Sequence, residues 1–167
     1  MSERTKLTLL KKADHPKIHN LIGKEITLWI NPIPYPPKKQ DIYNWLNQMS
    51  KKSNKTFTIR KKINNVIIGM IWIEDITKSQ AEIGFWLGKK YQGKGYMKEA
   101  GKLITKHARK LKIKKLKAIT VGKNISSQKT LEKLGFSLKK VFKKDFKNQL
   151  KEWCDVLIYE QRLAKTL

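Results

Sequence analysis

Glycines concentrated in one short segment are the strongest chemical signal in this chain. Residues 84–96 read Gly-Phe-Trp-Leu-Gly-Lys-Lys-Tyr-Gln-Gly-Lys-Gly-Tyr and lie between a strand-like and a helix-like stretch. At the N-terminus of a helix, backbone N–H groups lack an intrahelical acceptor and carry partial positive charge, and glycines let a diphosphate approach them closely. The segment therefore predicts a phosphate-binding loop, with added positive charge from Lys89, Lys90 and Lys94.

Three phosphate-binding patterns compete for this segment. The nucleoside-triphosphatase loop nearly matches residues 88–95, but Gly95 replaces the Ser or Thr that should hold magnesium. The dinucleotide loop requires a third glycine where Lys98 stands, and an acidic residue about 20 positions later, where this chain has lysines. The coenzyme A pattern, [Arg/Gln]-x-x-Gly-x-[Gly/Ala], reads Lys90-Tyr-Gln-Gly93-Lys-Gly95, with lysine in the first place. A tight turn that caps a helix is the alternative without a ligand.

A second segment favours the coenzyme A interpretation. Residues 122–136 fit the pattern Asn-x-x-Ser-x-x-x-Leu-Glu-Lys-x-Gly-Phe in register, through Asn124, Ser127, Leu131, Glu132, Lys133, Gly135 and Phe136. Together, the two segments resemble the GNAT superfamily of N-acetyltransferases, and most closely its branch of bacterial ribosomal-protein N-terminal acetyltransferases. The resemblance covers roughly residues 80–160. The first 55 residues, on the acceptor side of such folds, match only loosely.

The resemblance implies that an amine attacks acetyl-CoA directly, without an acyl-enzyme. Glu82 would be the general base, and Ser127, at the family position that faces the sulfur, would be the general acid. The strand at 82–88 would diverge from the strand at 116–121 and leave a cleft for the pantetheine arm. The residues implied to bind the coenzyme are Phe85, Trp86, Leu87, Lys90, Tyr91, Gln92, Gly93, Lys94, Gly95, Tyr96, Asn124 and Lys129.

Each catalytic assignment has an ordinary structural alternative. Strand alternation sends Glu82 and Trp86 to one face, where shielding by Trp86 or Trp72 would raise the carboxyl pKa to a useful value. Glu82 is equally typical of a half-solvated strand face. The Ser127 hydroxyl could cap backbone in a first helical turn, and Asn124 is a good helix cap in its own right.

Other reactive or aromatic residues favour structural roles. His107 lies on the apolar face of the helix after the loop, and Cys154 lies within a strand, so both should pack in the core. His15 and His19 share a face but have no evident third ligand, so no metal site is expected. Four aromatic residues near a proline-rich loop would either wall an acceptor pocket or pack beneath it: Trp29, Tyr35, Tyr43 and Trp45.

The acceptor is an amine of open identity. A protein N-terminus such as that of a ribosomal protein, an amino sugar or antibiotic, or a small amine would each suit the chemistry. Polyamines are less attractive because a multiply charged cation requires a carboxylate cluster, and Glu74, Asp75 and Glu82 are the only close acidic group in this basic chain.

The elements that position these residues follow from hydrophobic periodicity and turn signals. Strands are predicted at 5–10, 56–62, 66–75, 81–88, 116–121, 136–146 and 151–159, and helices at 14–26, 37–49, 94–111 and 126–134. This order predicts an α+β fold. Its GNAT-like form would be a mostly antiparallel, mixed sheet of about seven strands with a splayed pair, flanked by about four helices.

Net charge leaves a second function class open. Lys and Arg number 38 against 13 acidic residues, which gives +25, yet only four of the 38 are arginines. Lysines spread along the whole chain fit a compositional bias as well as a binding role. A non-catalytic basic module that binds RNA or the ribosome is therefore the alternative, and RNA contact through the basic surface would also be compatible with an enzyme.

Size and hydropathy bound the remaining possibilities. The 167 residues are typical of one domain, expected to span 1–167. No apolar run approaches the roughly 20 residues of a membrane span, and the N-terminal residues lack a signal-peptide core. A single cysteine excludes an internal disulfide framework. We therefore expect a cytoplasmic protein without membrane contact, either a monomer or a homodimer.

Overall fold

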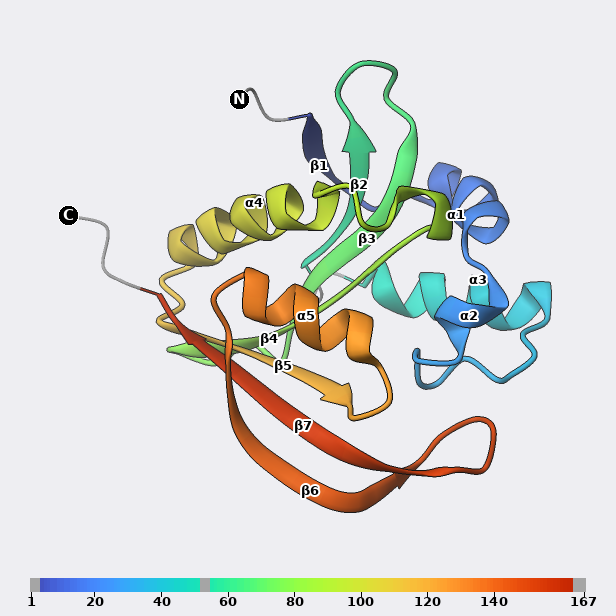
Figure 1. Cartoon of the computed structure of the whole chain (residues 1–167). Helices are drawn as coiled ribbons and strands as arrows, with labels where there is room; N and C mark the ends of the chain where they lie inside the picture. Colours follow the sequence, from blue (N-terminus) through green and yellow to red (C-terminus); the bar gives the residue numbers. More distant parts are fainter. Residues whose placement is uncertain (1–3, 52–54, 164–167) are drawn as a thin grey trace.

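The computed structural model describes residues 4–51 and 55–163 (Figure 1). Within these residues seven strands form one sheet in the order β1-β2-β3-β4-β5-β7-β6. The strands are β1 Thr5–Leu9, β2 Lys55–Lys61, β3 Ile67–Glu74, β4 Gln80–Leu87, β5 Lys115–Val121, β6 Ser137–Lys147 and β7 Trp153–Arg162. All neighbours are antiparallel except β4 and β5, which are parallel. The predicted α+β class and mostly antiparallel sheet are confirmed.

Helices cover both faces of the sheet (Figure 1). They are α1 His15–Leu21, α2 Lys24–Thr27, α3 Lys39–Met49, α4 Tyr96–Lys110 and α5 Ile125–Lys133, with short 3-10 turns η1 Lys12–Asp14 and η2 Lys89–Tyr91. Apolar residues of α4 and α5 share one buried cluster with the sheet. Those of α1, α2 and α3 share a second cluster with β3 and β4. The central strands are therefore buried from both sides.

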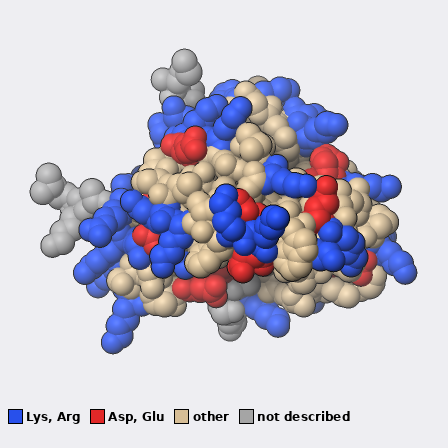
Figure 2. Space-filling model, turned by 60° about the horizontal axis from the view of Figure 1, so that its bottom comes forward, with Lys and Arg blue, Asp and Glu red and all other residues tan. Residues whose placement is uncertain are grey.

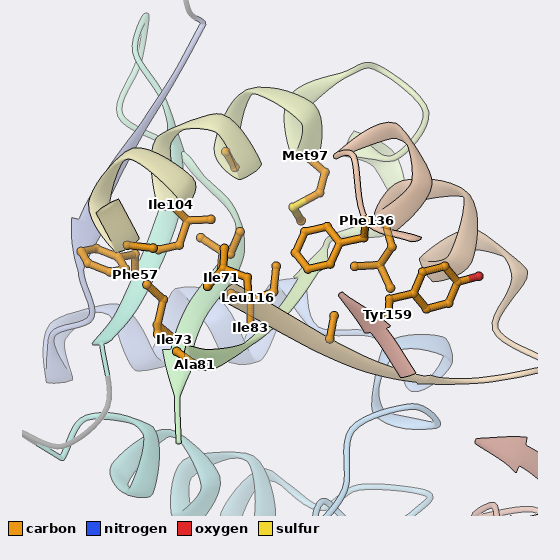
Figure 3. Packing of buried hydrophobic residues seen from close by; sticks show 14 of the residues in the cluster. Phe57, Ile71, Ile73, Ala81, Ile83, Met97, Ile104, Leu116, Phe136 and Tyr159 are labelled. Atoms are coloured by element: carbon orange, nitrogen blue, oxygen red, sulfur yellow. The ribbon is translucent and has the colours of Figure 1, made fainter. Parts of the chain in front are cut away.

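The core under α4 follows from the apolar spacing of that helix. Met97, Ala100, Ile104 and Ala108 recur at intervals of three and four residues and are all buried. Figure 3 shows Met97 and Ile104 pointing toward side chains of the strands and of Phe136. Each large side chain buried in this way contributes about 1.5–3 kcal/mol of hydrophobic stabilisation, so this contact anchors the start of α4 on the sheet.

The N-terminal helical region differs from the single helix predicted at 14–26. Gly23 adopts an extended conformation and separates α1 from α2. Asp14 lies at the start of α1, but its side chain makes no capping bond to the helix. Its Oδ1 instead accepts a hydrogen bond of 2.6 Å from Nη2 of the buried Arg60. A buried guanidinium requires a charged partner, and this requirement outweighs helix capping.

The third helix largely matches its predicted position. It begins at Lys39, two residues after Pro37, and Asp41 Oδ2 accepts a hydrogen bond of 2.8 Å from the Lys38 N–H at its start. Its apolar residues at helical spacing, Ile42, Trp45, Leu46 and Met49, are all buried. This face packs on the side of β3 and β4 opposite to α4.

Two residues expected in the core are found there. His107 is half-buried on α4, and its ring lies edge-on to Phe57 at 5.0 Å between centroids. Cys154 on β7 is only 3% exposed. Both predictions of a packing role are therefore confirmed.

Charged side chains are dispersed on the face of the molecule that Figure 2 presents. Lysine and arginine side chains extend around much of its outline, with acidic side chains among them. They do not gather there into a single patch. In the described residues, the structure has no helix that is both long and apolar enough to cross a membrane.

Candidate active site

Strands β4 and β5 separate shortly after they meet. They pair over Gln80–Glu82 and Lys115–Lys117, and no pairing follows beyond these residues in the described chain. β5 pairs with β7 along its whole length, and β4 pairs with β3 as far as Leu87. The predicted splayed pair is confirmed. Its opening frees one edge of β4 at the position where the sequence predicts a cleft.

A cleft of about 990 Å³ runs through this opening. Nine of the predicted site residues line it: Glu82, Phe85, Trp86, Leu87, Gln92, Gly93, Gly95, Asn124 and Ser127. Five others are not among its lining residues: Lys90, Tyr91, Lys94, Tyr96 and Lys129. Of these, Lys90 and Tyr91 belong to η2, Tyr96 is the first residue of α4, and Lys129 is exposed on α5. The fold thus joins the two sequence motifs in one cavity.

The glycine loop presents unpaired backbone donors at the start of α4. Gly93 and Gly95 have φ angles of 72° and 82°, in the left-handed region that favours glycine. Gly95 is the N-cap of α4, and within the described residues no acceptor meets the N–H groups of residues 93–98. A Cβ on Gly93 would meet no atom within 4 Å. The loop is therefore an open cradle of donors at the positive end of a helix.

Long-range contacts brace this cradle, and the sequence did not indicate them. Arg4 donates from Nη2 to the Lys94 carbonyl at 2.9 Å and from Nε to Glu99 Oε1 at 2.7 Å. Its guanidinium also lies 4.6 Å from the centre of the Tyr96 ring. Gln92 Nε2 donates to the Leu87 carbonyl at 2.9 Å. Arg4 is distant from the loop in sequence, so only the β1–α4 contact reveals its role.

Two lysines that sequence reasoning left unassigned also line the cleft. Lys98 lies in the first turn of α4, and Lys133 is the last residue of α5. They also both line a second, smaller cavity. Both lysines could have been found from the sequence, because Lys133 is part of the second motif and Lys98 follows the last glycine of the loop by three residues.

Glu82 lies where β4 and β5 begin to separate. Burial raises its pKa to about 7, and the carboxylate of Glu74, directly opposite on β3, adds to the rise. Lys117, its neighbour across the parallel pair, acts in the other direction. Within the described residues the Glu82 carboxylate has no hydrogen bond or ion pair. It can therefore exchange a proton near neutral pH.

The two tryptophans expected near this carboxylate belong to the same cleft. Trp72 and Trp86 line the cleft with Glu82. Trp72 Nε1 donates to Glu74 Oε1 at 2.7 Å. A Cβ at Gly84 would lie 2.1 Å from Trp72 Cζ2, so glycine at this position lets the indole lie across β4.

The second motif places the Ser127 hydroxyl in the cleft. Asn124 Oδ1 accepts a hydrogen bond of 3.2 Å from the Ser127 N–H and caps α5. The Ser127 hydroxyl is half-buried and has no partner within the described residues. The helix-cap role weighed for Asn124 is therefore present, whereas the backbone cap weighed for Ser127 is not.

The aromatic residues near the proline loop divide into two groups. Trp29 and Trp45 line the cleft, whereas Tyr35 and Tyr43 do not. The Tyr43 ring lies near the rings of His15 and His19, with centroid distances of 5.9 and 6.0 Å. In the described parts of the chain, no group of three or more His, Cys, Asp or Glu side chains is placed to hold a metal ion.

In one cleft, the separated strands present the N–H groups of the glycine loop and a carboxyl group whose pKa is raised. Together, this fold and this site define an acyltransferase-like class of protein. Residues 4–137 match the model of the acetyltransferase (GNAT) domain, and this chain belongs to the GNAT acetyltransferase family. The family resemblance seen in the sequence is thereby confirmed.

Individual relatives are more distant. The chain is similar to the probable N-acetyltransferase YjcK of Bacillus subtilis (strain 168), with 27% identity over 114 residues. That match spans 66% of this chain and 63% of YjcK, which is less than two thirds of its length.

Solved structures share the fold at lower identity. RimL, a ribosomal L7/L12 alpha-N-protein acetyltransferase solved in complex with coenzyme A, has a TM-score of 0.83 and 19% identity, over 99% of this chain and 97% of that one. A GNAT-family acetyltransferase from Bacillus anthracis has a TM-score of 0.82 and 22% identity, over 97% and 96% of the two chains.

Proposed function

We propose that this protein is an acetyl-CoA-dependent N-acetyltransferase that moves an acetyl group to a primary amine by direct attack in a ternary complex. One arrangement carries the proposal: a single cleft connects the unpaired N–H groups of residues 93–98 with Glu82, whose pKa is about 7. The first feature suits a diphosphate and the second suits proton removal from an ammonium.

Coenzyme binding would depend mainly on backbone. The N–H groups of the glycine loop would hold the diphosphate, and Lys98 and Lys133 would add positive charge beside it. Lys90, Lys94 and Lys129, which are exposed, would neutralise the outer phosphates. Asn124 Nδ2 and the open edge of β4 at Phe85 and Leu87 would bond the pantetheine arm. The bound thioester supplies an activated acetyl group.

The chain's own residues would then carry the protons. Glu82 accepts a proton from the acceptor ammonium, which frees the nitrogen lone pair. As the new C–N bond forms and the C–S bond breaks, N–H groups on the open edge of β4 stabilise the negative charge on the carbonyl oxygen. The Ser127 hydroxyl gives its proton to the departing sulfur and regains one from the attacking nitrogen, which loses its second proton as the amide forms. A thiol is already a good leaving group, so this acid needs to contribute only modestly.

The fold likeness to RimL supports a protein N-terminus, such as that of a ribosomal protein, as one acceptor, with small amines as the other class. On the face that Figure 2 presents, the charge is dispersed, and the continuous basic patch that would suit a non-catalytic RNA-binding module is not seen there. We further propose one domain spanning the described residues and a cytoplasmic location, where acetyl-CoA is available.

Thermal shift with coenzyme A tests the assignment. The wild type should show a saturable rise in melting temperature at micromolar coenzyme, because ligand binding stabilises the native state. Gly93→Glu should lose this response because it places bulk and negative charge in the donor cradle. Ser137→Glu adds the same charge on exposed β6 and should behave like the wild type. No response of the wild type at millimolar coenzyme, or an unchanged response in Gly93→Glu, would contradict the assignment.

A further inference from the structure

Arg4 holds the glycine loop from outside the cleft. Gly93 and Gly95 line the cleft, whereas Arg4, just before β1, is not among its lining residues. Glu99, in the first turn of α4, accepts hydrogen bonds from the Arg4 backbone N–H at 2.8 Å and from its Nε at 2.7 Å. The Arg4 Nη2 donates to the Lys94 carbonyl at 2.9 Å. One guanidinium therefore joins the start of α4 to the backbone of the loop.

The Lys94 carbonyl sets the direction of the next backbone donor. The cis peptide bonds of the described chain precede Pro32 and Pro36, so the bond between Lys94 and Gly95 is trans. In a planar trans peptide the C=O and the following N–H point in opposite directions. Because the carbonyl faces Arg4, the Gly95 N–H faces away from it. This N–H has no acceptor in the described chain.

Glycine makes the reverse orientation of this peptide accessible. Gly95 has φ 82° and ψ −2°, the angles of the third residue in a type II turn. Rotation of the preceding peptide gives a type I turn, with φ of about −90° at this residue. Glycine adopts either sign of φ at little cost. The rotated peptide would replace the Gly95 N–H by the Lys94 carbonyl, which repels a diphosphate.

Other contacts confine the Arg4 side chain. Its guanidinium lies 4.6 Å from the centre of the Tyr96 ring, and a Cβ on Gly95 would lie 3.3 Å from its Nη2. The Thr5 N–H and hydroxyl also donate to Glu99, at 3.1 and 3.2 Å. An isolated exposed ion pair stabilises a protein little. Here several partners fix one geometry, and that geometry includes the loop carbonyl.

We propose that Arg4 is a positioning residue for the coenzyme. It keeps the Lys94–Gly95 peptide in the orientation that presents the Gly95 N–H to the diphosphate, and Glu99 keeps Arg4 in place. Arg4 acts through this peptide and not by touching the reacting atoms. The inference rests on the proposed function, because it concerns the coenzyme end of the same cleft.

The size of the effect follows from the two orientations of the peptide. When only a fraction of the molecules is competent to bind, the apparent Kd rises by the inverse of that fraction. If Arg4→Ala leaves about a tenth of the molecules in the competent orientation, coenzyme A should bind about tenfold more weakly in calorimetric titration. Arg162→Ala is the matched control, because it removes the same charge from the exposed end of β7. It should leave the Kd unchanged.

The peptide itself can be observed. Lys94–Gly95 is the one Lys-Gly pair in the sequence. Labelling of lysine carbonyl carbons with ¹³C and of glycine nitrogens with ¹⁵N therefore gives a single correlation in an NMR spectrum. In free Arg4→Ala this signal should move or split, and saturating coenzyme A should return it to the position of the bound wild type. A purely structural role of Arg4 would lower the melting temperature and leave both the signal and the Kd unchanged, which would overturn the inference.

Arg4→Lys separates charge from geometry. A lysine ammonium keeps the positive charge beside Glu99 but lacks the planar fork that reaches the carboxylate and the Lys94 carbonyl together. This variant should resemble Arg4→Ala in the Kd and in the signal, and it provides the same test if Arg4→Ala does not fold. Wild-type behaviour of Arg4→Lys would mean that charge alone is sufficient, and would overturn the inference.

The two proposals fail in different ways. A wild type that does not bind coenzyme A would remove the acetyltransferase assignment, and the signal of the free variants would still test whether Arg4 orients the peptide. A wild type that binds coenzyme A no more tightly than Arg4→Ala, with the same signal in both proteins, would remove the role of Arg4 and leave the assignment.

Discussion

Replacement of Glu82 by glutamine should have opposite effects on activity and stability. Burial and the neighbouring Glu74 raise the pKa of Glu82 from 4.5 to about 7 in the folded protein. A pKa difference of this size lowers the free energy of unfolding above pH 7 by about 3 kcal/mol. Partial solvent exposure of Glu82 reduces this cost to roughly 1–2 kcal/mol. Glutamine avoids this cost, so Glu82→Gln should raise the melting temperature at pH 8 by about 2–8 °C. It should also lower kcat/KM about 100-fold or more, because the general base is lost.

The pH dependence of this stability difference has a defined sign. Below pH 4.5 both folded and unfolded chains hold the proton, and the variant has no advantage. Between pH 4.5 and about 7 the folded protein keeps a proton that the unfolded chain releases, so wild-type stability falls as pH rises. Above this window the difference is constant. The advantage of Glu82→Gln should therefore grow through the window and then level off.

The assay is thiol release from acetyl-CoA with a saturating amine acceptor, followed from pH 5 to 9. The wild type should gain activity through an apparent pKa near 7, and coenzyme affinity should be the same in the variant. Glu74→Gln is the matched control. Removing this carboxylate should shift the rise of activity with pH to lower pH without abolishing turnover. Wild-type kcat/KM in Glu82→Gln, or a flat wild-type profile, would refute the role of Glu82 as base.

Two further substitutions test other parts of the structure. Ser127→Ala should lower kcat roughly tenfold with unchanged coenzyme affinity, measured by steady-state kinetics and titration, and wild-type turnover would remove Ser127 from the acid role. Asp14→Asn should lower the free energy of unfolding by about 3 kcal/mol in urea denaturation, because it leaves Arg60 buried without a counter-ion. The control is Glu160→Gln, which breaks the more exposed pair with Lys115. An effect of Asp14→Asn as small as that of the control would contradict this account.

Local signals predicted most elements of this fold. The αL conformation of Gly135 ends α5 as glycine commonly does, and the turn before Val66 joins β2 to β3 as expected. The apolar residues of α3 recur at helical spacing and mark its buried face, and Ala100, Ile104 and Ala108 do the same on α4. Boundaries differed by one to three residues, except where Gly23 divides the first predicted helix.

The site was predicted less completely because part of it depends on contacts between distant residues. Strand alternation indicated Glu82, and the two motifs indicated Gly93 and Ser127; all three line the cleft. Arg4 was not identified, since its effect on the loop exists only when β1 lies beside α4. The pKa of Glu82 likewise depends on Glu74, which becomes its neighbour through strand pairing.

The sequence by itself determined the glycine loop, the helix that follows it and the chemical types available for catalysis, because these depend on residues near one another along the chain. Tertiary structure alone decided that Glu82 is buried beside Glu74, in a cleft that Lys98 and Lys133 also line. The physical reason is that Coulomb interactions and burial depend on distance in space, and the forked sheet sets those distances.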